Sequence, residues 1–393
     1  MKFYTTIYVI VLLLIFITDH YLYKYSEKRN IIQKIKLVFP TFFFSITYTA
    51  IKIFGANIDN YRFNFWLMWF NLFFLTFYIL RIIYVFLRFF QNKYPARITE
   101  IKSVYYMLSG AFVIVMFWSV FMNPLNMKVE MIQVVDKELP ASFNNYKIVQ
   151  ISDAHLGARM LDKRFFSNVV KKINEQNADM VVFTGDFVNN FAGEFTGFDT
   201  IFAKIKAKDG KFAILGNHDY GDYSVWKTAE AKELNLMRIM DGIARCGFKI
   251  IENEHVFLHR DTDSIALVGV GNYHATNTQK NYSDLTQAMK DIPQSGFQIL
   301  LTHNPVHWEV VQSEQPCINL LLSGHTHAGQ FGFDINGKVY SPIVFHYSTY
   351  NGLYTSNGQQ LYVNRGIGYI GLPMIIGLKP EITVLTLQQK VLK

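Results

Sequence analysis

The stretch that decides the fold class is KIVQISDAH, residues 147–155. Its first five residues are an apolar, β-branched run that predicts a buried strand, and polar residues follow directly where this strand ends. The same buried-strand character recurs over residues 180–183, 212–215, 265–268, 297–301 and 318–322.

Helical patterns separate several of these strands. They cover residues 163–174, 226–245 and 283–290. The alternation predicts an α/β domain over residues 146–393, in which helices cover the sheets. The preceding segment, 123–145, is short and mixed, and we expect a linker whose weak alternation over 129–135 suits a first strand.

Polar clusters follow five of the strands at their C-terminal ends, where open α/β sheets place their binding sites. The clusters contain Asp153 and His155; Asp186; Asn217, His218 and Asp219; His303; and His325 and His327. One histidine after a strand is usually a satisfied polar residue, and an isolated Gly-Asp pair is usually a turn. Five clusters in register with five strands predict one shared metal centre instead.

The types of ligand indicate the kind of metal. Carboxylates, imidazoles and one carboxamide, with no thiolate, suit Mn²⁺, Fe²⁺ or Zn²⁺ in a catalytic site better than a structural zinc. With His218 and Asp219 left aside, the clusters still contain four histidines, two aspartates and one asparagine, which are too many for one ion. Two ions about 3.5–4 Å apart, bridged by a carboxylate, would use all of them and clamp the oxygens of a displacement at phosphorus.

In their order along the chain, the clusters resemble those of the calcineurin-like metallophosphoesterases. The matching motifs are Asp153-x-His155, Gly185-Asp186, Gly216-Asn217-His218-Asp219, His303 and Gly324-His325-Thr326-His327. The resemblance covers about residues 146–388 and looks closest to the bacterial branch of exported or membrane-attached phosphodiesterases, through the segments 324–330, 364–368 and 380–383. It implies two packed β-sheets flanked by helices, an αββα sandwich.

The resemblance also implies a role for each site residue. One divalent ion would be held by Asp153, His155 and His327, the second by Asn217, His303 and His325, and Asp186 would bridge them. A hydroxide shared by the two ions would attack phosphorus. His218 would stabilise the phosphoryl charge or protonate the leaving oxygen, with Asp219 orienting its ring; a structural role for His218 is the alternative.

A few positions outside this pattern stay open. The family often has Gly-Asp-x-x-Asp, but Asn189 stands in the last place, and we expect the change to affect hydrogen bonds around the ligands more than the number of metals. Arg365 could contact a substrate phosphate or be a solvated loop residue. His274 and His307 are expected to be structural, although His274 could line the cleft.

The basic charge of the chain belongs to its N-terminal third. The 393 residues carry a formal net charge of +8, which by itself would suggest an anionic partner such as nucleic acid. Residues 1–122 hold 13 basic and 4 acidic side chains, whereas the remaining 271 hold 25 and 26. The catalytic part is therefore nearly neutral, and no nucleic-acid partner is expected.

The same N-terminal third predicts four membrane-spanning helices. The apolar stretches cover about residues 3–18, 37–55, 63–90 and 103–122, each near or above the roughly 20 residues that a span needs. A cleavable signal peptide is the alternative for the first stretch, but Thr18-Asp19-His20-Tyr21 is a poor cleavage site.

Basic residues in the short loops orient this bundle. Loops 19–36 and 88–102 contain five and four Lys or Arg residues, against two, Lys52 and Arg62, between the second and third stretches. The positive-inside rule then places these two loops in the cytoplasm. We therefore expect a multi-pass protein of the inner membrane, with the N-terminus and the catalytic domain on the outer, periplasmic side.

The sequence thus predicts a membrane-anchored, dinuclear metal-dependent phosphoesterase that hydrolyses a phosphodiester or pyrophosphate, with a lipid or lipid-linked substrate. The alternatives are an exported nucleotidase or phosphoprotein phosphatase, and a non-enzymatic membrane scaffold that retains the fold. Cys246 and Cys317 are compatible with one disulfide, but two buried thiols are favoured because neither lies in a motif.

Overall fold

The structure is a computed structural model that describes residues 61–159, 162–276, 280–315 and 317–390, together with isolated positions before residue 61. Its contacts divide the chain into two units, Met1–Val120 and Phe121–Lys393.

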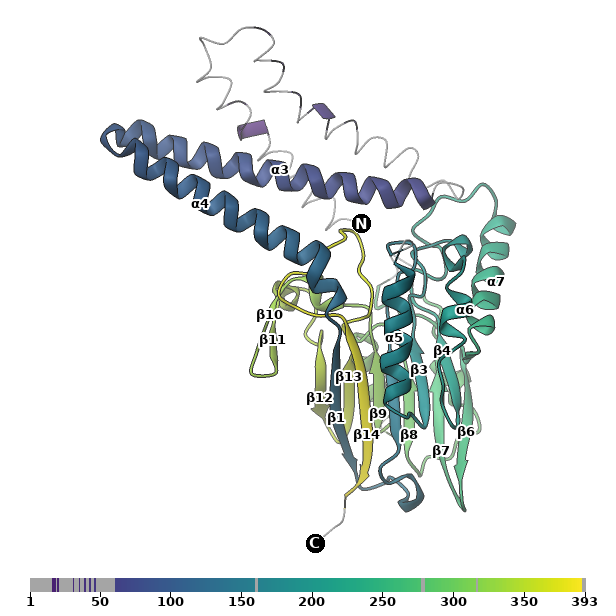
Figure 1. Ribbon diagram of the computed structural model, residues 1–393. Coiled ribbons are helices and arrows are strands. Elements are labelled where there is room, and N and C mark those ends of the chain that lie inside the picture. Colours follow the sequence, from purple (N-terminus) through teal and green to yellow (C-terminus); the bar gives the residue numbers. More distant parts are fainter. Residues whose placement is uncertain are drawn as a thin grey trace. The chain divides into compact units, whose positions relative to one another are not determined.

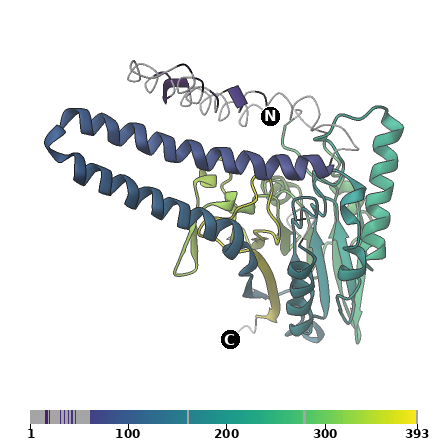
Figure 2. The same cartoon turned by 45° about the horizontal axis from the view of Figure 1, so that its top comes forward.

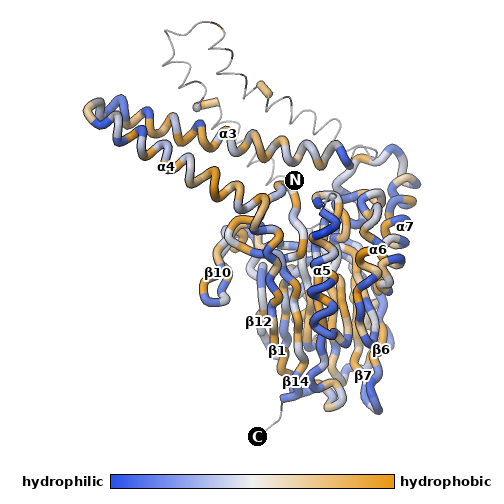
Figure 3. The backbone as a smooth tube through the Cα atoms, viewed as in Figure 1, coloured by the Kyte–Doolittle hydropathy of each residue, from blue (hydrophilic) through white to orange (hydrophobic). Residues whose placement is uncertain are grey.

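The N-terminal unit contains a pair of long helices, α3 (Tyr61–Lys93) and α4 (Ile98–Phe117), joined by the turn η2 (Pro95–Arg97). Figure 2 shows them as a hairpin, and Tyr84 of α3 meets Tyr105 of α4 with ring centroids 5.6 Å apart. Both helices are hydrophobic along most of their length, with polar residues at the turn that joins them (Figure 3). Many of their large apolar side chains, such as Phe73, Phe86 and Ile114, are exposed in the structure, which suits helices that face lipid.

Two helices in the described part of the chain are long and apolar enough to cross a membrane, over Met68–Lys93 and Thr99–Leu125. They correspond to the predicted stretches 63–90 and 103–122. The stretches 3–18 and 37–55 fall largely outside the described residues. The structure therefore shows two candidate spans where the sequence predicted four.

The larger unit is built on two six-stranded mixed sheets (Figure 1). The first sheet has, in spatial order, β1 (Lys128–Asp136), β14 (Glu381–Gln389), β2 (Lys147–Ile151), β3 (Met180–Thr184), β4 (Gly210–Ile214) and β5 (Lys249–Ile250). The second has β12 (Gly352–Ser356), β13 (Gln359–Val363), β9 (Leu320–Ser323), β8 (Gln298–Leu301), β7 (Asp263–Gly269) and β6 (Glu254–Arg260). The predicted α/β class is confirmed.

Most neighbours in the two sheets are parallel. The antiparallel pairs are β14 with β2, β12 with β13 and β6 with β7. Because β2, β3 and β4 run parallel, as do β7, β8, β9 and β13, their carboxyl ends meet at one edge of each sheet. The segment 123–145, expected as a linker, contributes β1, which pairs with β14 from Lys128↔Glu381 to Asp136↔Gln389.

Side chains that alternate along the strands divide the core into three layers. Met180 and Val182 of β3 belong to the cluster between the two sheets, whereas Val181 and Phe183 belong to the cluster beneath the helices of the first sheet. A third cluster packs the outer face of the second sheet against Trp308 and its neighbours. Three apolar layers between four layers of structure are the expected result when both faces of each sheet are buried.

Five helices belong to this unit: α5 (Lys163–Glu175), α6 (Asp199–Phe202), α7 (Ala229–Arg245), α8 (Leu285–Ala288) and α9 (His307–Glu314). Helix α7 begins later than the predicted residue 226, because the Thr228 hydroxyl accepts a hydrogen bond from the Ala231 N–H and caps the helix there. The prediction over 283–290 was too long, since Asp284 caps a helix of a single turn. Cys246 and Cys317 are both free thiols, as favoured.

Candidate metal centre

The predicted site residues lie at the carboxyl ends of strands from both sheets. In the first sheet, β2 leads to Asp153 and His155, and β3 to Asp186. In the second, β8 leads to His303, and β9 to the loop with His325. The two edges are joined by hydrogen bonds, because His303 Nδ1 donates to the Thr184 carbonyl over 2.7 Å and Gln150 Nε2 donates to the Ser323 carbonyl over 2.8 Å. One site built from both sheets is the consequence.

One group of potential ligands consists of Asp153, His155 and His327. His155 Nε2 and His327 Nε2 are 3.0 Å apart, and His327 Nε2 is 3.3 Å from Asp153 Oδ1. All three side chains are buried. One potential ligand atom from each residue lies within 4.8 Å of the others, an arrangement in which they could surround a cation.

A second group consists of Asp186, His303 and His325. His303 Nε2 lies 3.2 Å from Asp186 Oδ2 and 3.2 Å from His325 Nδ1. The same Asp186 Oδ2 is 3.6 Å from His155 Nε2 of the first group. Asp186 therefore lies between the two groups, within reach of both.

Hydrogen bonds at the far side of two rings fix the nitrogen that faces the site. His155 Nδ1 is 3.1 Å from Asn189 Oδ1, and His303 Nδ1 is 2.7 Å from the Thr184 carbonyl. Both partners are oxygen acceptors, so each Nδ1 carries a proton and each Nε2 is the nitrogen that faces the site. Asn189, which departs from the family pattern, thus contacts a ligand through a hydrogen bond as the sequence suggested.

Asn217 and His218 complete the ring of predicted residues. Asn217 Nδ2 donates to the Tyr223 hydroxyl over 2.8 Å, while its buried Oδ1 has no hydrogen-bond partner among the described residues. The His218 ring stacks on Tyr223 at 4.4 Å and its Nδ1 lies 2.7 Å from the Asn189 carbonyl. A buried carboxamide oxygen without a hydrogen-bond partner, beside a cluster of histidines and aspartates, fits a ligand of a cation.

The backbone of the site is held in an unusual conformation. Five of the predicted residues have positive φ: Asp153 at 53°, His155 at 44°, Asp186 at 61°, His325 at 73° and His327 at 50°. Left-handed backbone is costly for residues other than glycine and persists where surrounding structure enforces it, most often at functional sites. These loops are therefore shaped to aim side chains at a common centre.

Ionisation also suits a cation. Burial alone would raise the pKa of Asp153, but neighbouring His327 outweighs it and the pKa falls to about 2. Burial lowers the pKa of His155 and of His325 to about 3. Burial would also lower the pKa of His303, but the Asp186 carboxylate raises it to about 9. Ionised carboxylates and neutral imidazoles are the forms that bind metals, and the proton on His303 is the one that a metal would displace.

Asp219 supports the site through the backbone. Its buried carboxylate accepts hydrogen bonds from the N–H groups of Asp186, Val188 and Gly216, over 2.8, 3.1 and 3.0 Å. The His218 ring, which Asp219 was expected to orient, is held by the Asn189 carbonyl. The position of Asp219 therefore favours a role in fixing the Asp186 loop.

Arg365 is engaged in buried ion pairs. Its guanidinium lies 2.9 Å from both Glu130 of β1 and Glu381 of β14, and Nη1 donates to Asn351 Oδ1 over 3.0 Å. The Arg365 residue is only 5% exposed. Both Nη atoms donate hydrogen bonds within the protein and two carboxylates pair with the charge, which favours a structural role over contact with a substrate phosphate.

Three residues that support the site were not found from the sequence. Tyr347 places its hydroxyl 3.0 Å from His325 Nε2, and Tyr223 contacts both Asn217 and His218. Glu194 is buried and accepts hydrogen bonds from four backbone N–H groups, those of Gly157, Asn189, Asn190 and Phe191. Tyr347 meets a partner 22 positions away along the chain, whereas most partners of Tyr223 and Glu194 are close in sequence, but no motif marks any of the three residues.

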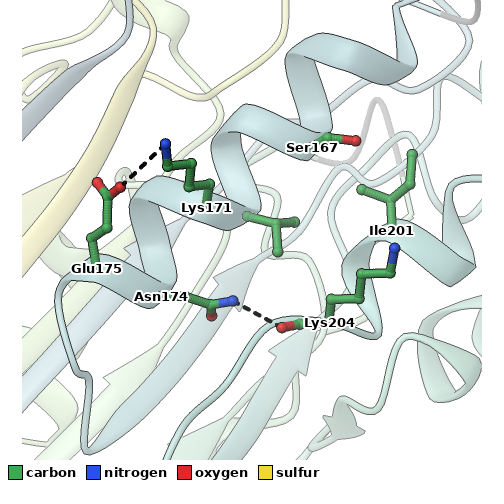
Figure 4. Close-up of a pocket in the computed structure, with 7 residues that line it drawn as sticks. Ser167, Lys171, Asn174, Glu175, Ile201 and Lys204 are labelled. Carbon is green, nitrogen blue, oxygen red and sulfur yellow. Dashed lines mark hydrogen bonds and ion pairs between the residues drawn. The ribbon is translucent and has the colours of Figure 1, made fainter.

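A surface groove between α5 and α6 lies apart from these residues (Figure 4). Its lining includes Ser167, Lys171, Asn174 and Lys204, and none of the predicted ligands. Asn174 Nδ2 donates to the Lys204 carbonyl over 2.9 Å, and Lys171 pairs with Glu175. The groove therefore lies apart from the predicted metal ligands.

The α/β unit is similar in sequence to known proteins. Residues 146–329 match the calcineurin-like phosphoesterase family. The uncharacterized metallophosphoesterase YkuE of Bacillus subtilis is 32% identical over 253 residues, which are 64% of this chain and 82% of that protein. A transmembrane protein with metallophosphoesterase domain of Danio rerio is 30% identical over 67% of this chain and 57% of its own length. An uncharacterized metallophosphoesterase of Helicobacter pylori is 32% identical over 65% of this chain and 61% of its own length.

Together these matches mean that the chain belongs to the calcineurin-like metallophosphoesterases. It is a metal-dependent phosphoesterase, as predicted. This chain spans about 60% of the length of the fish and Helicobacter relatives and 82% of YkuE.

Proposed function

We propose that the chain is a membrane-anchored phosphoesterase with a dinuclear centre, which hydrolyses a phosphodiester or pyrophosphate bond of a lipid or lipid-linked substrate. The observation that carries the dinuclear part is the position of Asp186 Oδ2, 3.2 Å from His303 Nε2 and 3.6 Å from His155 Nε2. A carboxylate between two ligand groups is the arrangement that a pair of ions requires.

The proposed ligand sets follow these two groups. Asp153, His155 and His327 would hold one ion, Asn217, His303 and His325 the other, and Asp186 both. Two divalent cations, Mn²⁺, Fe²⁺ or Zn²⁺, would act as Lewis acids toward the phosphate. They would also lower the pKa of a bound water toward neutrality.

His218 is the proposed acid. Its Nδ1–H donates to the Asn189 carbonyl, which leaves Nε2 for the substrate, and the ring is less buried than those of His155 and His303. Because Nδ1 already carries a proton, Nε2 holds one only in the imidazolium form, and that proton can pass to the leaving oxygen as the ester bond breaks. Burial lowers the pKa of His218 and disfavours this form, so a negatively charged phosphate beside the ring would have to favour it. Stacking on Tyr223 and the Asn189 contact fix the ring, so that little reorganisation is needed at the moment of transfer.

Membrane anchoring rests on the apolar helices α3 and α4 and on the name of the Danio rerio relative. The proposed arrangement has four spans, with the basic loops 19–36 and 88–102 in the cytoplasm and the catalytic domain outside. An anchored site works next to the bilayer, which makes a lipid phosphoester the economical substrate.

The orientation can be tested with reporter fusions after Asn126. We expect alkaline phosphatase, which folds only outside the cytoplasm, to be active at this position, and a cytoplasm-dependent fluorescent reporter to be dark. The opposite pattern would place the catalytic domain in the cytoplasm.

The activity can be tested with the purified, detergent-solubilised chain and Mn²⁺, on bis-p-nitrophenyl phosphate and on a panel of lipid phosphodiesters and pyrophosphates. We expect His218→Ala to lose activity by about 10²–10⁴-fold, the range for removal of a proton-transfer group. Asp186→Ala should lose activity as well, because the carboxylate proposed to hold both ions is removed. His259→Ala, on the exposed surface of β6, is the matched control and should retain activity. Equal activity in wild type and both site variants would show that the site is assigned wrongly.

A further inference from the structure

A small hairpin beyond the metal loop exposes an unusual amount of apolar surface. It consists of β10 (Phe333–Ile335) and β11 (Lys338–Tyr340). Phe333, Ile335 and Tyr340 are 56%, 57% and 49% exposed. Phe345, in the following turn η8 (Pro342–Phe345), is 93% exposed. Several large apolar side chains in one short segment are more than the scattered exposed residues of an ordinary surface.

The strand register places these side chains on one face. Phe333 is paired with Tyr340 and Ile335 with Lys338, so the four side chains project to the same side. The opposite face carries Asp334 and Val339, and Val339 is buried. The outward face of the hairpin is therefore largely apolar, where the usual pattern places polar side chains.

The hairpin is fastened to the chain directly after the second candidate span. That span ends at Leu125, and three residues later Lys128 forms an ion pair of 2.9 Å with Asp334 on the inner face of the hairpin. Asn123, within the end of the span, donates a hydrogen bond of 2.8 Å to the Ile375 carbonyl.

The segment around Ile375 also holds the start of the hairpin. Phe331 forms a bridge with Ile376, and the Gly332 N–H donates to the Ile376 carbonyl over 3.0 Å. The hairpin is therefore in direct contact with Lys128, three residues after the second candidate span, and is joined through the segment around Ile375 to Asn123 at the end of that span.

The same segment begins and ends at the metal centre. It leaves the centre at the turn η7 (His327–Gln330), which contains a potential ligand, and returns to it at Tyr347, whose hydroxyl is 3.0 Å from His325 Nε2. The exposed Phe345 lies two residues before Tyr347. A short stretch of chain thus connects the apolar face of the hairpin to the loops that carry the potential metal ligands.

We infer that the face formed by Phe333, Ile335 and Tyr340, together with Phe345, rests in the headgroup region of a lipid bilayer and brings the metal centre to the membrane surface. Aromatic and aliphatic side chains with a lysine beside them are the composition of interfacial elements, and Lys338 lies next to Tyr340, its Nζ 5.4 Å from the ring centroid. A lysine at this depth also attracts anionic lipid head groups. The inference rests on the proposed membrane anchoring and adds a second membrane contact to it.

The test measures where a fluorescent label sits. The full chain, with Cys317→Ser to remove the more accessible thiol, receives one cysteine at a time: Phe333→Cys, Phe345→Cys, Val113→Cys in α4, or Lys137→Cys. Lys137 follows the far end of β1, about 30 Å along the strand from Lys128. Each labelled protein is reconstituted in phosphatidylcholine and phosphatidylglycerol vesicles. It is then exposed to lipids with a doxyl group about 5–10 Å below the surface, the depth of interfacial side chains, or to aqueous iodide.

We expect doxyl lipid to quench the labels at positions 113, 333 and 345 and iodide to quench the label at 137. Quenching at 113 with only iodide quenching at 333 and 345 would overturn the inference and leave membrane anchoring intact. Quenching by neither agent at 333 and 345 would also overturn it, because protein, such as a second copy, would then cover the face. Absence of lipid quenching at 113 would overturn the proposed anchoring and the inference with it. Hydrolysis of phosphodiesters is measured in a separate experiment. The quenching result does not depend on catalytic activity, so failure of the proposed activity and failure of the inference can be told apart.

Discussion

At the scale of single residues, the site depends on side chains that hold the ligands as much as on the ligands. Asn189 is the clearest case, because one residue contacts two parts of the centre: its side chain meets His155 Nδ1 at 3.1 Å and its carbonyl meets His218 Nδ1 at 2.7 Å. The segment 189–191 is fixed in turn by the buried carboxylate of Glu194. The departure from the family pattern at this position therefore keeps a hydrogen-bond acceptor where the ligand needs one.

Replacing Asn189 by alanine tests this role. The carbonyl that holds His218 remains, so only the contact to His155 is lost, and we expect metal affinity or activity to fall by about 10–100-fold, as for other partners of metal-bound histidines. Metal binding is measured by titration with Mn²⁺ and activity on bis-p-nitrophenyl phosphate.

Two further variants frame that result. Asn189→Asp retains an acceptor and should recover much of the affinity. Asn190→Ala is the matched control, because its side-chain Oδ1 has no hydrogen-bond partner among the described residues, and it should behave as wild type. Equal metal affinity in Asn189→Ala and wild type would contradict the role.

At the scale of elements, the two sheets must pack face to face with the carboxyl ends of their strands on the same side, so that ligands from both can meet. Arg365 contributes to this, because it follows β13 of the second sheet and pairs with Glu130 and Glu381 of the first. Glu381 is itself buried and accepts a hydrogen bond of 2.6 Å from the Tyr362 hydroxyl. The arginine thus joins β13, β1 and β14 below the metal loops.

Arg365→Ala should therefore act on stability. Removal of the guanidinium leaves the buried Glu381 carboxylate without its counter-charge, whereas Glu130 keeps its ion pair with Lys128. Loss of one partner of a buried pair costs about 3–5 kcal/mol of unfolding free energy. Thermal unfolding of the detergent-solubilised chain measures the change. Arg245→Ala is the control, since its ion pairs with Asp199 and Asp241 are exposed and worth about 0–1 kcal/mol. An unchanged melting temperature with a raised KM would instead support substrate binding by Arg365.

At the scale of the whole molecule, metal binding and folding of the catalytic unit are coupled. The buried histidines and aspartates come from five strand ends, so the site exists only when both sheets are formed. A ligand that binds only the folded state stabilises it by mass action, by about 2.7 kcal/mol when its concentration is one hundred times the Kd. The helices α3 and α4 belong to a separate unit and should not respond.

Metal removal tests this coupling. We expect treatment with EDTA to lower the melting temperature of the catalytic unit and added Mn²⁺ to restore it. In Asp186→Asn both effects should shrink, because the shared carboxylate is lost. A melting temperature that is insensitive to chelation, in protein shown by elemental analysis to have lost its metal, would contradict the prediction.

Much of this architecture could be predicted from the sequence because it is written in local patterns. Apolar runs gave the strands β2, β3, β4, β7, β8 and β9 nearly to the residue, and the polar clusters stood directly after them. The spans 3–18 and 37–55 and the orientation of the bundle remain predictions. The apolar hairpin β10–β11 was not predicted, because strands of three residues have too short a pattern to detect.

The sequence by itself therefore determined the fold class, the family and the identities of the residues at the strand ends, since strand patterning and adjacency along the chain are local properties. Only the tertiary structure decided which of these residues face one another. Asp153 and His327 meet across 174 positions of sequence, and Arg365 meets Glu130 across 235. Contacts at such separations depend on how the two sheets pack and on the register of each strand, which no segment of the chain encodes alone.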